Sequence, residues 1–315
     1  MYAASVAVIG GGEWGLALAA AAARTGTRTS LYSRRSLDGR LPKDVQGLKD
    51  LPAVASARLI VLATPSEVTR DVARRLGDVV DGRHLLVHGT RGLAGDAMDR
   101  ISEVLRQETP ARRVGALGGP VLAEDLLAGR PSVLVCGSHY PEVNDAILKA
   151  FGSASLRIYA TSDLCGLEWA SALVGCLAIG VGYAQEVGLN AGLIAALISR
   201  GVEEAGRVAA AAGGEERTLL GLAGYGDLLA SISQKERPEV VVGAALARGK
   251  TVDEAVAEAK LRVEAIDLLP RVADWIAERH VVAPIFRALA LSLLSGRSPE
   301  AIVHELMTSP RQKLA

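Results

Sequence analysis

The feature that most constrains the fold is a glycine-rich segment that joins an apolar strand to an apolar helix. Residues 5–9 read SVAVI, residues 10–15 read GGGEWG, and the helical sequence LALAAAAAR follows. In this context Gly10 permits a tight turn, Gly12 lets a pyrophosphate approach bare backbone, and Gly15 lets helix and strand pack closely. The helix N-terminus adds N–H groups that attract an anion. The segment predicts a dinucleotide-binding unit, and the alternative is a turn without a ligand.

The first half of the chain then alternates strands and helices. Further strands are predicted at 27–32, 58–63, 84–88, 113–117, 132–136 and 156–159, with helices at 17–24, 66–76 and 96–107. This order predicts a mostly parallel sheet that is covered on both faces by right-handed crossovers.

From about residue 160 the strand signals disappear, and an apolar period of 3.6 residues predicts helices alone. Thr251 and Glu254 have the spacing of a capping box, and Ser298-Pro299 is a typical helix start. The fold class is therefore α/β, with a Rossmann-type parallel-sheet domain at residues 1–159 followed by an all-α domain at residues 160–315.

Composition narrows the classes of partner. The 315 residues carry 35 basic and 35 acidic side chains, so no net charge favours nucleic acid or an anionic membrane, and we expect neither partner.

The three cysteines lack metal-site spacing, which predicts buried thiols, no bound metal and a reducing, cytoplasmic location. No signal peptide is visible at the N-terminus. The apolar stretch 169–184 is too short for a membrane span, so we predict a buried central helix.

The end of the second strand bears on the choice of cofactor. It reads Tyr32-Ser33-Arg34-Arg35, and no carboxylate follows before Asp38. A carboxylate at this place would bind the ribose 2′-hydroxyl of NAD, whereas two guanidinium groups suit the 2′-phosphate of NADP. We therefore predict NADP, with NAD as the other candidate; the alternative is that both arginines are solvated surface residues.

Ordered motifs then extend over almost the whole chain. They are GGGEWGLALA at 10–19, RLP at 40–42, ATPS at 63–66, GPVLA at 119–123, GRPS at 129–132, GLEWASAL at 166–173, AALISRG at 195–201, GLAGYGDL at 221–228, PI at 284–285 and GRSP at 296–299. With them the chain resembles the bacterial NAD(P)-dependent glycerol-3-phosphate dehydrogenases.

The resemblance implies a cytoplasmic homodimer in which the helical domain binds substrate and mediates dimerisation. It implies hydride transfer between the nicotinamide and dihydroxyacetone phosphate, a phosphorylated triose, giving glycerol 3-phosphate for glycerophospholipid metabolism. Together with the residue arguments above, it gives these cofactor-binding candidates: Gly10, Gly12, Glu13, Trp14, Gly15, Arg34, Arg35, Pro65, Arg91, Ala123, Arg237 and Glu264.

The positions that differ from the family pattern are those that the family uses for catalysis and ligand binding. The family's catalytic lysine and the asparagine after it correspond to Val174 and Gly175, and valine cannot transfer a proton. A second asparagine and lysine correspond to Gly192 and Ile194. An arginine of the family corresponds to Pro238, unless a one-residue slip gives its role to Arg237. An earlier lysine is Arg91, which keeps the charge but is a poor proton donor.

These losses leave a short set of catalytic candidates, namely Asp227, Ser231 and Arg91, with His88 and Lys235 as further candidates for a proton donor. Several candidates also have a purely structural interpretation. Asp227 could be a helix N-cap, and His88 could be a hydrogen-bonded structural histidine. Glu168 either orients a substrate or is a helix N-terminal acid, and Glu264 and Lys235 could be solvated.

Two functions follow from this balance. The first is an oxidoreductase like the family, acting on dihydroxyacetone phosphate or on a substrate with a less anionic head. The second is an inactive or weakly active paralogue that binds the cofactor and serves as a redox sensor or partner subunit. We favour the oxidoreductase.

Overall fold

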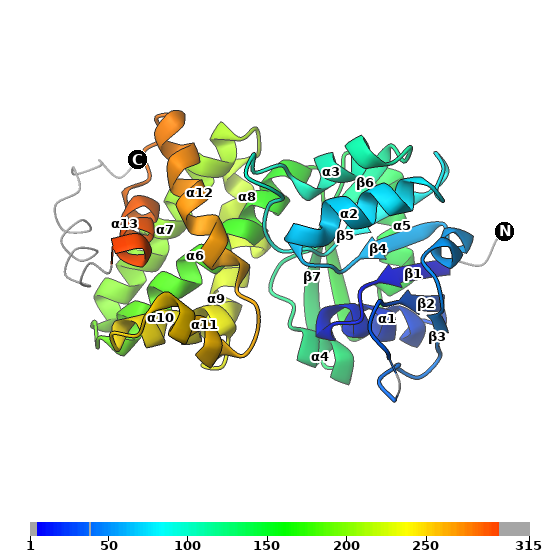
Figure 1. The fold of residues 1–315 in the computed structure, drawn as a ribbon, viewed down its shortest axis with the longest axis horizontal. Coiled ribbons are helices and arrows are strands. Elements are labelled where there is room, and N and C mark those ends of the chain that lie inside the picture. The colour runs from blue at the N-terminus through cyan, green and yellow to red at the C-terminus, as the bar shows by residue number, and fades with distance from the viewer. Residues whose placement is uncertain (1–4, 38, 296–315) are drawn as a thin grey trace. The chain divides into compact units, whose positions relative to one another are not determined.

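The computed structural model describes residues 5–37 and 39–295, and its ribbon is shown in Figure 1. The chain divides into two compact units, Met1–Glu168 and Trp169–Ala315. The N-terminal unit has an eight-stranded sheet with helices around it, and the C-terminal unit is helical throughout its described part. The predicted fold class, a Rossmann-type sheet domain followed by an all-α domain, is confirmed.

The strands of the N-terminal unit are β1 (Ser5–Ile9), β2 (Arg28–Tyr32), β3 (Val45–Leu48), β4 (Leu59–Leu62), β5 (Leu85–His88), β6 (Arg113–Gly118), β7 (Ser132–Gly137) and β8 (Leu156–Thr161). Its helices are α1 (Glu13–Arg24), a 3-10 turn at Pro52–Ser56, α2 (Ser66–Gly77), α3 (Ile101–Glu108), α4 (Ala123–Ala128) and α5 (Pro141–Phe151).

The sheet order is β3-β2-β1-β4-β5-β6-β7-β8, and every neighbouring pair is parallel except β6 and β7. The strands β2 and β3 follow on one side of β1 and β4 and β5 on the other, so the strand order switches sides between β1 and β4, which is where ligands bind in doubly wound sheets. In this register Ile9 pairs with Tyr32 and Leu62, and Leu62 pairs with His88. Four strand ends therefore lie at one edge of the sheet.

Five elements of this unit differ from the sequence prediction: the 3-10 turn, α4 and α5 were not predicted, β3 was missed, and α3 begins later than expected. The strand β3 was not predicted because VQGL is half exposed and has no alternating apolar pattern. The helix predicted at 96–107 begins at Ile101, since Met98 has φ +57° and Ala94 forms an antiparallel bridge with Asp99. A tight turn therefore takes the place of the predicted first helical turn.

The helices of the second half are α6 (Leu164–Glu186), α7 (Ala191–Ala211), α8 (Glu216–Leu220), a π-helical turn at Leu222–Gly226, α9 (Asp227–Ile232), α10 (Pro238–Ala247), α11 (Val252–Ala259), α12 (Glu264–Glu278) and α13 (Pro284–Ser295). The predicted capping box at α11 is present, with Thr251 Oγ1 accepting from Glu254 N and Glu254 Oε2 accepting from Thr251 N. The predicted helix start at Ser298-Pro299 lies outside the described residues.

The helix α6 is the long apolar helix expected from the sequence. It is long and apolar enough to cross a membrane, yet its most apolar 18-residue window is entirely buried within the protein. The boundary between the two units lies within this helix, after Glu168. The sequence predicted the boundary after residue 159. The difference has a physical reason, because β8 continues to Thr161 and the Glu168 carboxylate binds residues of the N-terminal unit.

A buried carboxylate fixes the start of α13 to α7 in the C-terminal unit. Glu204 is fully buried, and its Oε2 accepts hydrogen bonds from the backbone N–H groups of Ile285 at 2.8 Å and Phe286 at 3.4 Å. Its Oε1 is buried and has no hydrogen-bond partner among the described residues. Burial raises the pKa of Glu204 to about 7, although the two amides and the charges of Arg207 and Arg200 lower it.

We expect Glu204→Gln to remove a pH dependence of stability. A raised pKa means that Glu204 contributes stability while it is protonated, below about pH 4.5, and that this contribution is lost as the pH rises through about 7. The loss is at most roughly 3 kcal/mol. Urea unfolding at pH 5 and pH 8 should therefore show equal stability of the two proteins at pH 5 and a more stable variant at pH 8. The exposed neighbour Glu203→Gln is the control, and an unchanged gap between wild type and E204Q at both pH values would refute the assignment.

Candidate functional site

The loop between β1 and α1 has the geometry that the glycine spacing predicts. Gly10 has φ +128°, and its N–H donates to Tyr32 O at 2.9 Å. A Cβ on Gly10 would lie 2.2 Å from Ala63 O, and a Cβ on Gly15 would lie 1.9 Å from Gly10 O. Both positions therefore require glycine, because any larger residue would displace the ends of β1 and β4 or the first turn of α1.

Gly12 differs from its neighbours because the space around it is open. A Cβ built on Gly12 meets no atom within 4 Å, and the residue is the exposed N-cap of α1 with no side chain capping the helix. The first turn of α1, which begins with Glu13, thus presents uncapped N–H groups to solvent beside bare backbone. This arrangement fits a pyrophosphate group.

Trp14 supplies a second indication of a ligand. Its Nε1 is buried and has no hydrogen-bond partner within the described part of the chain. A Cβ on Gly89 would lie 2.4 Å from this nitrogen, so the indole packs directly on the backbone that follows β5. A buried donor without an acceptor is costly, and a bound phosphate or ribose oxygen would satisfy it. The residues of this loop therefore fit a dinucleotide.

The end of β2 reaches the same loop through Ser33. A Cβ on Gly11 would lie 2.5 Å from Ser33 Oγ, and Ser33 Oγ accepts from Arg35 N at 3.1 Å. Arg34 and Arg35 are exposed, and neither forms an ion pair with another described residue. Both guanidinium groups are therefore available to a 2′-phosphate.

We expect Arg34→Ala and Arg35→Ala to weaken NADPH binding by about tenfold each, because a hydrogen bond to a charged group contributes roughly 1.5–3 kcal/mol. Binding of NADH should be unchanged, since it lacks the 2′-phosphate. Fluorescence titration of both cofactors measures the two affinities. The exposed Arg40 is the control, and an equal loss for NADH and NADPH would show that the arginines do not read the 2′-phosphate.

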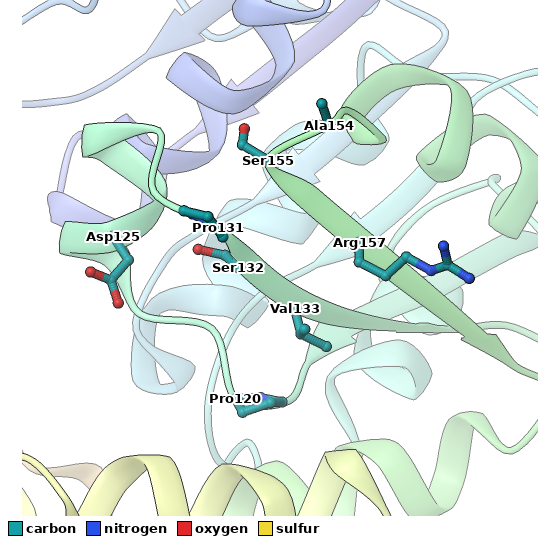
Figure 2. Close-up of a pocket in the computed structure, with 8 residues that line it drawn as sticks. All are labelled: Pro120, Asp125, Pro131, Ser132, Val133, Ala154, Ser155 and Arg157. Carbon is teal, nitrogen blue, oxygen red and sulfur yellow. The ribbon is translucent and has the colours of Figure 1, made fainter.

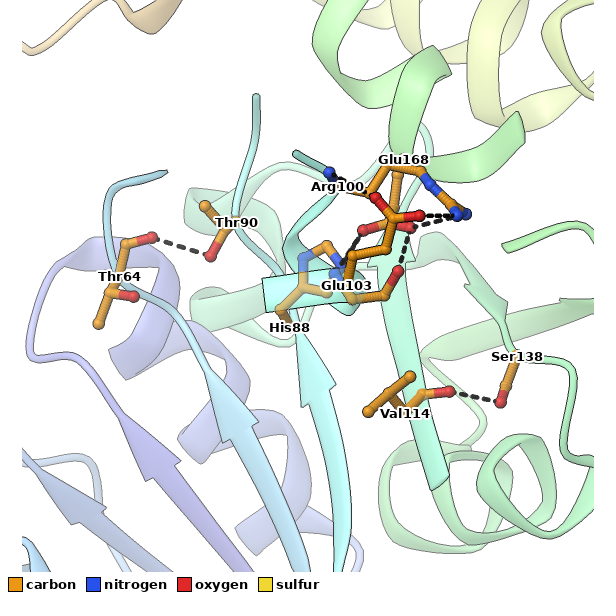
Figure 3. Close-up of polar contacts among 9 residues, drawn as sticks. Thr64, His88, Thr90, Arg100, Glu103, Val114, Ser138 and Glu168 are labelled. Carbon is orange, nitrogen blue, oxygen red and sulfur yellow. Dashed lines mark hydrogen bonds and ion pairs between the residues drawn. The ribbon is translucent and has the colours of Figure 1, made fainter. Parts of the chain in front are cut away.

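The turns after β4 and β5 are joined by hydrogen bonds, as Figure 3 shows for Thr64 and Thr90. Thr90 Oγ1 donates to Thr64 O at 2.9 Å, and Thr64 and Thr69 share a bond of 3.1 Å. Pro65 is the exposed N-cap of α2, and Arg91 follows Thr90 as a half-buried residue. Two predicted cofactor residues therefore lie on turns at the carboxyl edge of the sheet.

Ala123 opens α4, and it is partly buried against the apolar core that α1 shares with the sheet. The helices α1 and α4 are in contact. The structure therefore places Ala123 on an element that packs on the phosphate-loop helix, and a role in cofactor binding stays a prediction.

A buried polar cluster lies where α3 and α6 begin, at the end of β5 (Figure 3). Glu168 Oε1 accepts from His88 Nε2 at 3.0 Å and from Ser102 N at 2.8 Å, and its Oε2 accepts from Ser102 Oγ at 2.6 Å. Arg100 Nη1 lies 3.9 Å from Oε2. Burial disfavours the charge of Glu168, but the hydrogen bonds from His88 and Ser102 outweigh it and lower the pKa of the carboxyl.

This cluster decides two alternatives that the sequence left open. His88 is 2% exposed and hydrogen-bonded, as the structural alternative predicts, although its Nδ1 has no partner among the described residues. Glu168 is the fifth residue of α6 rather than an acid of its first turn, so it is neither a helix N-terminal acid nor exposed to a substrate. It binds the start of α6 to the end of β5 and the start of α3.

In the C-terminal unit Asp227 and Ser231 face each other across one turn of α9. Both are buried, and Ser231 Oγ donates to Asp227 Oδ1 at 3.4 Å. The N-cap of α9 is Gly226, which has helical dihedrals, and Asp227 is the first helical residue. The N-cap alternative for Asp227 is therefore wrong, because the preceding π-helical turn already supplies the helical backbone.

The start of α10 contains an ion pair that the sequence did not predict. Arg237, the N-cap of α10, donates from Nε to Glu239 Oε2 at 2.9 Å. A Cβ on Gly175 would lie 3.7 Å from Glu239 Oε1 and 3.3 Å from the Cβ of Ala265. Glu239 was missed because a glutamate in the first helical turn is usually solvated; its neighbours Arg237 and Pro238 were the available signal.

The other residues of this unit that the sequence singled out are Val174, Glu264 and Lys235, and they differ in burial. Val174 is 2% exposed in the apolar interior around α6, Glu264 is the half-buried first residue of α12, and Lys235 is exposed. The three cysteines are buried, and burial raises the pKa values of Cys136 and Cys176 to about 12. Among the described residues no three histidine, cysteine or acidic side chains are grouped as metal ligands would be.

A separate open pocket of about 400 Å³ lies in the N-terminal unit, where α4 ends and β7 and β8 begin (Figure 2). Its charged residues are Asp125 and Arg157. Asp125 already binds Arg130 at 2.5 Å, and Arg157 lies over the ring of Tyr159. No predicted site residue lines this pocket.

The doubly wound sheet, the glycine loop at its switch point and the helical unit that follows define a class of dinucleotide-dependent oxidoreductases. Residues 34–144 and 163–304 match the families described as the N-terminus and the C-terminus of NAD-dependent glycerol-3-phosphate dehydrogenase. The chain belongs to the NAD-dependent glycerol-3-phosphate dehydrogenase family.

Whole-chain comparisons agree. The glycerol-3-phosphate dehydrogenase [NAD(P)+] of Gluconobacter oxydans is 32% identical over 97% of each chain, and that of Leuconostoc mesenteroides is 30% identical over 97% of this chain and 98% of its own. The crystal structure of glycerol-3-phosphate dehydrogenase from Coxiella burnetii superposes with a TM-score of 0.89 at 26% identity and covers 97% of this chain and 99% of that one.

Proposed function

We propose that the protein catalyses hydride transfer between NADPH or NADH and the carbonyl carbon of a small hydroxyketone of the dihydroxyacetone phosphate type. The ketone becomes a secondary alcohol, and the cofactor leaves oxidised. The observation that supports this function is the uncapped, open backbone at Gly12 beside the sterically fixed Gly10 and Gly15. The cofactor supplies the hydride; the chain must bind both molecules and deliver a proton to the carbonyl oxygen.

The N-terminal unit binds the cofactor in this proposal. The first turn of α1 and the backbone of Gly12 hold the pyrophosphate, and Trp14 Nε1 donates to a cofactor oxygen. Arg34 and Arg35 bind the 2′-phosphate, which makes NADP the preferred cofactor. Pro65 and Arg91 supply further contacts from the turns after β4 and β5, and Ala123 does so from α4.

The proton source must be a group other than Val174, because a valine side chain carries no titratable proton. We assign this role to Asp227, with Ser231 as its hydrogen-bonded partner. Their burial and their contact of 3.4 Å support the assignment, since a buried carboxyl group next to a hydroxyl can hold and pass a proton. Arg91 retains a cation that binds an anionic or polar part of the substrate.

The test is oxidation of NADPH at 340 nm with dihydroxyacetone phosphate and, separately, with dihydroxyacetone. Turnover with either ketone supports the function, and Asp227→Asn should then lower kcat by about 10²–10⁴-fold. No turnover with either ketone, while fluorescence shows that NADPH is bound, would reject it. The relatives reported above are named as dehydrogenases, and no observation favours an inactive redox sensor.

The proposal extends to a homodimer in the cytoplasm. Three buried cysteine thiols suit a reducing compartment, and the resemblance to the family suggests the dimer. Light scattering after size exclusion measures the mass directly.

A further inference from the structure

The turn after β5 is fixed on both sides of Gly89. On one side His88, which is 2% exposed, donates from Nε2 to Glu168 Oε1 at 3.0 Å. On the other side Thr90 Oγ1 donates to Thr64 O at 2.9 Å, and Figure 3 shows both contacts. Gly89 lies between these two anchors, which therefore determine where its backbone sits.

The indole of Trp14 packs on this backbone. A Cβ on Gly89 would lie 2.4 Å from Trp14 Nε1 and 3.2 Å from its Cε2, so no side chain separates the indole from the turn. Trp14 is the second residue of α1, in the helical turn that the proposed function assigns to the pyrophosphate. The Gly89 N–H also continues the sheet by donating to Leu62 O at 2.8 Å. A shift of the end of β5 is therefore transmitted to the indole by direct contact.

The imidazole of His88 uses only one of its two nitrogens. Its Nδ1 is buried and makes no hydrogen bond to any residue in the described part of the chain. An apolar side chain of similar size would fill the same space without this unsatisfied atom. The imidazole therefore contributes the bond to Glu168, whose carboxylate is itself held by the backbone N–H and the hydroxyl of Ser102. This bond ties the end of β5 to a buried anchor.

We propose that His88, held by Glu168, is a positioning residue that sets the Trp14 indole for cofactor binding. It acts through the backbone of Gly89 and not by contact with the cofactor. The Nε2–H of His88 fixes the end of β5, and the indole that rests there then directs its own N–H to a cofactor oxygen. Thr90 holds the same turn from its other side. This inference rests on the proposed function, because it concerns the cofactor site of that reaction.

The test is the affinity for NADPH, measured by fluorescence titration without a ketone. His88→Leu should weaken binding by about tenfold, the effect of one lost hydrogen bond to a charged group. His88→Gln, whose side-chain amide still offers a donor to Glu168, should recover most of the affinity. Ser102→Ala is the matched control, because it removes another bond to Glu168 and lowers stability while the turn stays anchored. Its affinity for NADPH should equal that of the wild type.

Unchanged NADPH affinity in His88→Leu, or an equal loss in Ser102→Ala, would overturn the inference. If His88→Leu does not fold, Thr90→Val decides the matter. It releases the same turn from its other anchor and should also weaken NADPH binding, and an unchanged affinity there would overturn the inference.

A double-mutant cycle shows whether the effect passes through the indole. Trp14→Phe alone should weaken NADPH binding, and adding His88→Leu to it should cause no further loss. Additive losses would overturn the inference, because His88 would then act by another route. Binding also separates this inference from the proposed function. If neither ketone is reduced but the affinities change as stated, the proposed reaction fails and the positioning role stands; if a ketone is reduced but the affinities do not change, the reverse holds.

Discussion

Replacement of Gly12 by valine should leave the fold intact and lower the affinity for NADPH by at least about 100-fold. Gly12 has φ −76° and ψ 173°, an extended conformation that valine adopts readily, and a Cβ there meets no atom within 4 Å. The added methyl groups would occupy the place where a pyrophosphate must approach the helix N-terminus. Loss of two hydrogen bonds to a charged group accounts for about 3 kcal/mol, which is the 100-fold effect.

Gly15→Ala is the matched comparison for this prediction. Its Cβ would lie 1.9 Å from Gly10 O, so the backbone must move and stability must fall together with binding. In Gly12→Val the urea midpoint should stay close to that of the wild type. Fluorescence titration with NADPH and urea unfolding of both variants distinguish the two effects. An affinity within threefold of the wild type in G12V would show that the cofactor does not use this loop.

The sequence was sufficient for the fold because the decisive features are local. The strand, the GxGxxG spacing and the helix after it are contiguous, and the register places Ile9 beside Tyr32 and Leu62 as a parallel sheet requires. The same local reasoning failed for β3, which is paired with β2 but has no apolar alternation of its own. Hydrogen bonding to β2, rather than the residue types of β3, determines its strand conformation.

The candidate site was harder to predict because its side chains meet across long separations in sequence. Glu239 meets Gly175 across more than sixty residues, and the partners of Glu168, His88 and Ser102, are more than sixty residues earlier in the chain. No spacing rule joins such positions. The sequence could therefore name Glu168 and His88 as candidates, but only the packing shows that they bind each other and that neither is open to a substrate.

Removal of the Glu168 carboxylate should have the largest effect on stability of any single substitution considered. In Glu168→Ala the N–H and hydroxyl of Ser102 and the Nε2–H of His88 lose their acceptor inside the protein. Breaking a buried charged network by removing one partner costs about 3–5 kcal/mol. Urea unfolding at pH 7 should show this loss, and Glu168→Gln, which keeps an acceptor oxygen, should lose less.

Glu142→Ala gives the matched surface control. Glu142 also binds two arginines, Arg58 and Arg113, but its side chain is 43% exposed, so its loss should cost no more than about 1 kcal/mol.

The pH dependence of stability gives a second test of the Glu168 network. Because the pKa of Glu168 is lowered in the folded protein, its contribution is present above the unfolded value of about 4.5 and is lost as the pH falls through the folded value. The wild type should therefore lose more stability than E168A below about pH 4.5. Parallel acid unfolding curves for the two proteins would mean that the Glu168 carboxylate is not ionised in the fold.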